Sequence, residues 1–164
     1  MQMSADLGDP LLIADGPVGT RRILYAKRGT FFGARLRGEL LPGGGDWVLQ
    51  RQDGIAELDI RFVLRTDDEQ LIYATCDGIA DISPEVRERI RTGGEVDSSE
   101  YYFRTAVTFE TGAEKYRWLN RLLAVGVGKR TPCRHGDRGI CNQLVTRGPI
   151  PGVKAFVPCV PILF

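Results

Sequence analysis

Histidine is almost absent from this 164-residue sequence, since His135 is its one example. A metal site that needs two histidines is therefore excluded, and a Ser-His-Asp triad would depend on this one residue. The sequence also lacks a Gly-x-Ser-x-Gly nucleophile motif, a phosphate-binding P-loop and a dinucleotide-binding glycine fingerprint. If His135 and the cysteines are set aside, what remains for catalysis is carboxylate, tyrosine, arginine and tryptophan side chains, and we expect neither a cofactor nor a metal.

Neither sign of charge dominates, and no apolar run is long. The 22 basic and 21 acidic residues give a net charge of +1, without the basic excess that attracts nucleic acid or anionic membranes. Apolar stretches such as 122–125 are too short to cross a bilayer, and the first residues do not resemble a secretory signal. We predict a cytoplasmic protein that binds a small molecule, not nucleic acid or a membrane, with assembly into a homo-oligomer left open.

The four cysteines fit no disulfide scaffold or zinc framework. Cys133, His135 and Cys141 offer a set of soft metal ligands, but free thiols in a reducing cytosol are the preferred interpretation. Cys76 has no base beside it in the sequence, so we expect a packed and unreactive thiol.

Glycine and proline, 20 and nine residues, are spread along the chain and favour short strands joined by tight turns. The clearest strand is 56–65, where apolar residues alternate with mostly charged ones. Turn signals at 42–45 and 52–54 flank a strand that begins at Asp46. About eight such strands predict an all-β fold, a small antiparallel β-barrel of calycin-like size with one short helix.

That helix is expected directly after Ser83. Ser83 is a favourable N-cap, Pro84 suits the first helical position, and the glycines at 93–94 end the segment. Val86 and Ile90 lie one turn apart and predict one buried edge.

Several motifs together are similar to those of a bacterial protein family. They include Gly29-Thr30-Phe31-Phe32-Gly33, Leu41-Pro42-Gly43-Gly44-Gly45-Asp46-Trp47, Tyr102-Phe103-Arg104-Thr105 and Trp118-Leu119-Asn120. The sequence resembles the DUF3237 family, also called UPF0311, over residues 7–130. The resemblance implies a small antiparallel β-barrel, and because the family is largely uncharacterised it implies no particular activity.

The sequence departs from that pattern after residue 130. We predict one barrel domain over 1–130, with a net charge of −2, and a divergent, irregular tail over 131–164. Two explanations stay open: a frameshift near Thr131, since codons can be chosen so that a shifted frame encodes a run rich in β-branched residues, or a genuine divergent tail. The nucleotide sequence distinguishes them. With the frameshift, the barrel would lack its closing strand.

Asp46 and Trp47 directly follow three glycines. One interpretation is a carboxylate presented at a barrel rim beside an aromatic wall, where Asp46 is a general base. The other is an Asp that accepts hydrogen bonds from loop N–H groups while Trp47 packs the barrel end.

Asp59 and Arg61 lie two residues apart on one face of the strand at 56–65. In a polar lumen, Arg61 would bind an anionic or carbonyl group and Asp59 would orient it. On a solvated outer face the same pair would be a surface ion pair, which the alternation favours.

Aromatic residues on two later segments add a third group of candidates. Tyr102 and Arg104 share a strand face, as do Trp118 and Asn120 if their segment is extended. Aromatic rings with a few convergent donors suit a planar or carbonyl-rich ligand, although barrel core is the competing interpretation.

The resulting hypothesis is a β-barrel with a small-molecule pocket at one mouth. As an isomerase, lyase or cyclase it would use Asp46 as base, with Arg61 and Tyr102 stabilising the developing oxyanion. The ligand, carbonyl- or carboxylate-bearing, would be held by Trp47, Asp59, Arg104, Trp118 and Asn120. The alternatives are a non-catalytic ligand-binding barrel and an oligomerisation module.

Overall fold

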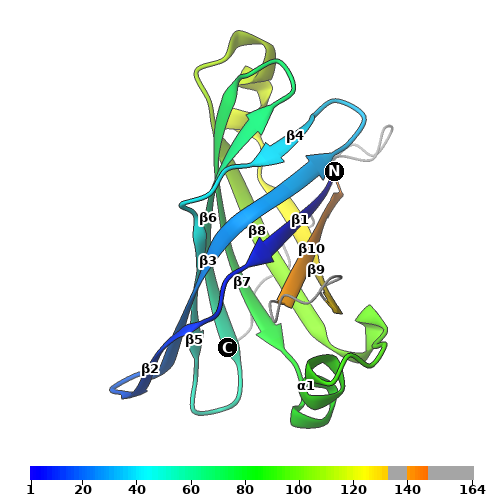
Figure 1. Ribbon diagram of the computed structural model, residues 1–164. Coiled ribbons are helices and arrows are strands. Elements are labelled where there is room, and N and C mark those ends of the chain that lie inside the picture. The colour runs from blue at the N-terminus through cyan, green and yellow to red at the C-terminus, as the bar shows by residue number, and fades with distance from the viewer. Residues whose placement is uncertain (133–139, 148–164) are drawn as a thin grey trace, which may run out of the picture.

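The computed structural model describes residues 1–132 and 140–147, with side chains described through Lys129. The described residues form ten strands, one α-helix and two 3-10 helices (Figure 1). The strands are β1 (Gln2–Leu7), β2 (Leu11–Gly16), β3 (Gly19–Phe32), β4 (Arg37–Leu40), β5 (Gly45–Gln50), β6 (Ala56–Thr66), β7 (Leu71–Asp81), β8 (Tyr102–Glu110), β9 (Ala124–Pro132) and β10 (Ile140–Arg147). The helices are α1 (Pro84–Arg91), η1 (Ser98–Glu100) and η2 (Glu114–Arg121).

The sheet closes on itself through antiparallel pairs. Its order runs β1, β10, β9, β8, β7, β6, after which β4 and β5 both bridge β6 to β3, and β3 pairs back to β1. Within the described residues β2 lies outside this ring, because it pairs with β3 alone. The predicted antiparallel β-barrel is confirmed.

The alternation along β6 defines the two faces of the barrel wall. Leu58, Ile60, Phe62 and Leu64 are buried, whereas the charged residues between them lie outside and are at least partly exposed. The interior at this strand is apolar, so the polar lumen considered for Asp59 and Arg61 is wrong.

Large apolar side chains fill the barrel. Phe31, Leu64, Ile72 and Phe103 are almost fully buried, and each contributes roughly 1.5–3 kcal/mol by leaving water. Gly128 of β9 faces the Phe103 ring so closely that a Cβ there would lie 2.3 Å from a ring carbon. A glycine is therefore required opposite this ring.

Helix α1 lies at one end of the barrel, as Figure 1 shows. The Ser83 hydroxyl accepts a hydrogen bond from the Val86 N–H, and Val86 and Ile90 are buried. The helix predicted after Ser83 is confirmed with its cap and its buried edge.

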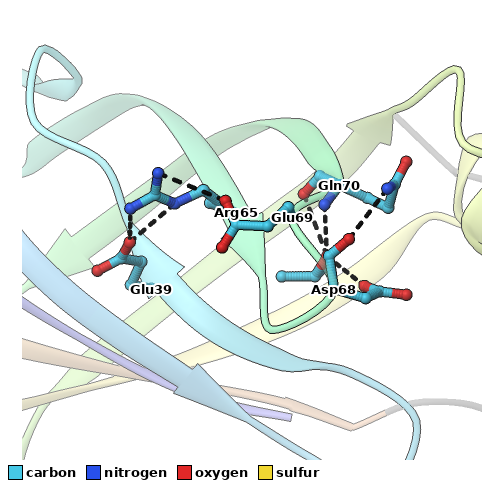
Figure 2. Close-up of polar contacts among 6 residues, drawn as sticks. Glu39, Arg65, Asp68, Glu69 and Gln70 are labelled. Carbon is cyan, nitrogen blue, oxygen red and sulfur yellow. Dashed lines mark hydrogen bonds and ion pairs between the residues drawn. The ribbon is translucent and has the colours of Figure 1, made fainter.

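The turn between β6 and β7 lies at the other end (Figure 1). The Thr66 hydroxyl donates to the Asp68 carboxylate at 2.6 Å and accepts from the Gln70 N–H at 2.9 Å (Figure 2). Beside the turn, Arg65 forms ion pairs with Glu39 of β4 and with Glu69 (Figure 2). These contacts fasten β4 to the turn.

Two segments differ from what the sequence pattern suggested. Trp118 and Asn120 lie in η2, not in an extended segment. Part of the predicted irregular tail is also regular, since β9 runs to Pro132 and 140–147 form β10. The open edges of β1 and β9 both gain a partner from β10, so the barrel does not lack a closing strand. The rest of the predicted tail lies outside the described residues.

Candidate functional site

The predicted site residues do not converge. Asp46 is 2% exposed and lies on the inner wall with Val48 and Gln50, whereas Trp47 alternates to the outer face of β5. Asp59 and Arg61 form an ion pair on the outer face at 2.9 Å, and that partner raises the pKa of Arg61.

Trp47, Asp59 and Arg61 nevertheless come together outside the barrel. The Arg61 guanidinium lies 5.7 Å from the centroid of the Trp47 ring. Trp47 and Asp59 also line a shallow groove of about 540 Å³ across β3, β5, β6 and β7. A second hollow of about 520 Å³ adjoins it through the shared residues Leu49 and Glu57. This groove is separate from Asp46, which faces inward.

Tyr102 and Arg104 occupy the outer face of β8. Tyr102 is 51% exposed, and the Arg104 guanidinium lies 5.2 Å from the centroid of its ring. Arg104 also donates a hydrogen bond to the Phe103 carbonyl at 2.9 Å. Both residues therefore lie on the opposite side of the barrel wall from Asp46.

Trp118 and Asn120 lie at the end of the barrel that holds the β6–β7 turn. The Asn120 amide accepts from the Thr111 N–H and donates to the Thr111 carbonyl, both at 2.9 Å, which closes the loop before η2. The Arg35 guanidinium lies 3.9 Å from the Trp118 ring centroid. Their observed contacts are structural.

The structure instead places residues that the sequence did not single out on the same inner wall as Asp46. In the register between β3 and β5, Arg22 lies opposite Val48. Asp46 and Gln50 are two residues to either side of Val48, so Arg22 is diagonal to both on the inner face. An inner-wall cluster of Arg22, Asp46 and Gln50 results.

Helix α1 adds a second guanidinium to this cluster. The Gln50 side-chain carbonyl accepts from Arg22 at 3.0 Å and from Arg87 at 3.3 Å. Arg87 is also anchored to the Ile82 carbonyl at 3.0 Å. The Gln50 amide nitrogen donates to the Gly54 carbonyl at 2.7 Å, which fixes the orientation of the amide. We call Arg22, Asp46, Gln50 and Arg87 the mouth cluster.

The electrostatics of the mouth cluster favour an added negative charge. Burial and the Arg87 guanidinium lower the pKa of Arg22, while Asp46 opposes them. The Nε of Arg22 is buried and has no hydrogen-bond partner within the described part of the chain. Two neighbouring guanidiniums, one of them acted on by a single carboxylate, can accept a monoanion or an oxygen that becomes negative.

The Cys76 thiol is buried, and the negative charge of Asp46 also disfavours its thiolate form. Burial, followed by Asp46 and Asp77, raises the pKa of its thiol to about 12. The prediction of a packed, unreactive thiol is confirmed for Cys76. The possible ligand set Cys133, His135 and Cys141 lies outside the described side chains.

Sequence inspection missed Arg22, Gln50 and Arg87 because they are far apart along the chain. One available signal was Arg22 itself, a charged residue at an inward position of a strand in a barrel of apolar interior. Its partners depend on the β3–β5 register and on the placement of α1, which no local pattern reveals.

The fold and the mouth cluster define a closed antiparallel β-barrel with a buried carboxylate and two arginines at one end. The chain belongs to the DUF3237 family, described as proteins of unknown function, whose model matches residues 1–142. It is 39% identical over 124 residues to a UPF0311 protein of Clostridium acetobutylicum, covering 75% of this chain and 78% of that protein. The family match thus extends beyond the region over which the motifs suggested it.

Solved structures show the same fold. The crystal structure of a conserved protein of unknown function from Rhodopseudomonas palustris has a TM-score of 0.78 and 29% identity, covering 88% of this chain and 91% of that chain. A β-barrel-like protein from Acinetobacter baumannii has a TM-score of 0.68 and 35% identity, with 88% and 90% covered. An enzyme from Penicillium herquei has a TM-score of 0.58 and 18% identity, with 90% and 91% covered, and shares the fold alone.

Membrane insertion through a helix has no support in the part of the chain that the structure describes. None of its helices has the length and apolar character that a bilayer crossing requires.

Proposed function

We propose that the barrel binds a small molecule bearing a carboxylate or a polarised carbonyl at the mouth cluster. The observation that carries this proposal is the convergence of Arg22 and Arg87 on one Gln50 oxygen, with the buried Asp46 acting on Arg22 from the same inner face. Like-charged guanidiniums so close together favour an anion, and the buried Arg22 Nε supplies a donor for it. The cytoplasmic location predicted from the sequence stays a prediction.

The same arrangement suits proton transfer without a cofactor. A substrate carbonyl held by Arg22 and Arg87 becomes more acidic at its neighbouring carbon, and Asp46 takes that proton. The enolate oxygen is stabilised by the two guanidiniums, and Asp46 returns the proton to another atom of the substrate. The reaction class is isomerisation, elimination or ring closure. Arg22 and Arg87 take the oxyanion role that the sequence analysis gave to Arg61 and Tyr102.

The binding step is tested with Arg22→Met and Arg87→Met. Each variant removes one charge-assisted hydrogen bond, worth roughly 1.5–3 kcal/mol, so ligand affinity should fall roughly 10- to 100-fold. The measurement is the thermal shift and calorimetric Kd with a panel of small oxo acids, beginning with pyruvate and levulinate. Arg61→Met is the matched control, because Arg61 pairs with Asp59 on the outer face. Equal losses in all three variants would refute the mouth cluster as the binding site.

The chemical step is tested with Asp46→Asn, which keeps the shape and removes the base. With an oxo acid that binds, wild-type protein in D₂O should exchange the acidic C–H for deuterium, as followed by proton NMR. The variant should bind the ligand yet exchange it at least about 100-fold more slowly. Exchange at the wild-type rate would rule out Asp46 as the base. Binding without exchange in the wild type would favour the competing function, a non-catalytic ligand-binding barrel.

A further inference from the structure

Strand β2 has an open edge. Each of the other strands in the described part of the chain is paired on both sides, whereas β2 pairs with β3 alone. Figure 1 shows β2 and the start of β3 extending away from the body of the barrel at one end. An open edge presents backbone N–H and C=O groups that a further strand can pair with.

The side chains on this edge strand are apolar and exposed. Leu11, Leu12 and Ile13 are 55%, 62% and 55% exposed, and Val18 in the following turn is 62% exposed. Proteins usually protect a solvent-facing edge with proline or with charged residues such as lysine, and such residues flank the apolar run of β2, as Pro10 and Asp15, while residues 11–14 include none. A run of adjacent exposed apolar residues on such an edge marks an interaction surface.

We propose that β2 pairs antiparallel with β2 of a second copy of this chain, forming a two-fold symmetric dimer. A two-fold axis that passes beside Leu12 sets each Leu12 opposite the other copy's Leu12, and each Leu11 opposite the other copy's Ile13. Residues 10–14 of the two copies then pair with one another and form about four intermolecular backbone hydrogen bonds.

The properties of the edge favour a copy of itself as the occupant. Leu12 lies on one face of β2, while Leu11 and Ile13 lie on the other, so the edge is apolar on both faces. A second β2 matches both faces, and a strongly charged partner finds no complementary charge in residues 11–14. Because β2 carries the open edge of the described barrel, self-pairing consumes that edge and assembly stops at two copies.

The test measures the mass of the full chain by sedimentation and light scattering over about 1 to 100 μM, the range expected for a short strand interface. The wild type should be dimeric in the upper part of this range. Leu12→Lys should weaken dimerisation roughly tenfold or more, because it places a charge on the edge strand. Leu123→Lys is the matched control, because Leu123 is 65% exposed away from β2 and should leave the dimer unchanged.

Three results would overturn the proposal. The first is a wild-type protein that stays monomeric at 100 μM. The second is a dimer that Leu12→Lys weakens no more than Leu123→Lys does. The third is a monomer in which Leu12→Lys lowers the melting temperature far more than Leu123→Lys, which would assign the edge to another segment of the same chain.

Discussion

At the scale of single residues, Asp68 connects parts of the chain that are distant in sequence. Its carboxylate accepts hydrogen bonds from the Lys115 ammonium at 2.6 Å, the Thr66 hydroxyl at 2.6 Å and the Tyr116 hydroxyl at 2.8 Å. In that order of size, these donors hold the pKa of Asp68 well below its usual value of 3.8. The same contact raises the pKa of Lys115. One carboxylate thus ties the β6–β7 turn to η2.

Asp68→Asn should lower the melting temperature by a few degrees at pH 7, because the amide keeps one acceptor but loses the charge. A carboxylate whose pKa is depressed by folding stabilises the protein above its unfolded pKa, and this contribution fades as pH falls below about 4. The gap between wild type and variant should therefore narrow from pH 5 to pH 2, as measured by thermal melts. Asp67→Asn is the control. The Asp67 carboxylate lies 3.9 Å from the Arg37 guanidinium, a long ion pair in which both side chains are largely exposed, so its loss should matter little. A gap that is constant across this pH range would contradict the charge-based explanation.

At the scale of elements, the sequence predicted those whose signals are local. The alternation of β6 and the Ser83 cap of α1 both lie within a dozen residues and were confirmed. In η2, the spacing of Trp118 and Asn120 fitted a strand face, but the Asn120 amide bonds both backbone groups of Thr111 and holds a compact turn instead. Strand β10 was missed because its extended conformation depends more on pairing with β1 and β9 than on the strand propensity of its own residues.

The candidate site shows the same limit. The sequence identified Asp46, the one member of the mouth cluster that a glycine-rich turn makes conspicuous. Its neighbour Arg22 is set by a register that spans more than twenty residues, and Arg87 by the docking of α1. Asp59 and Arg61 proved to be the surface ion pair that alternation favoured. The alternation along a strand thus predicts whether a side chain points into or out of the barrel. It does not predict which side chains from distant segments meet.

At the scale of the whole molecule, the two barrel ends differ. One end is held by the Asp68 contacts and the loop closed by Asn120, so its polar groups are used in structure. The other end holds the mouth cluster under α1, where the buried Arg22 Nε has no partner in the described residues. The polar contacts that hold the fold and the buried Arg22 Nε thus lie at opposite ends of the barrel, so substitutions in the mouth cluster should leave the Asp68 contacts intact.

The barrel as a whole depends on closure by β10. This strand aligns with β9 over eight register pairs and with β1 over four. At about one backbone hydrogen bond per pair, and a net 0.5–1.5 kcal/mol for each bond, losing β10 should cost at least about 5 kcal/mol. A typical domain has only about 5–15 kcal/mol in total. Closure is thus comparable with the whole stability of the fold.

A chain ending after Pro132 should consequently be largely unfolded or aggregated, because it exposes the edges of both β1 and β9. A chain ending after Arg147 is the matched control, since it keeps β10, and should remain folded and unfold cooperatively in urea. Urea unfolding and gel filtration measure both effects. If the chain ending after Pro132 were as stable as the control, β10 would contribute nothing, as expected if residues beyond 130 carry no selected structure. If the chain ending after Pro132 is unfolded while the control folds, residues 140–147 belong to the barrel. A frameshift near Thr131 would then have to encode a working closing strand by chance.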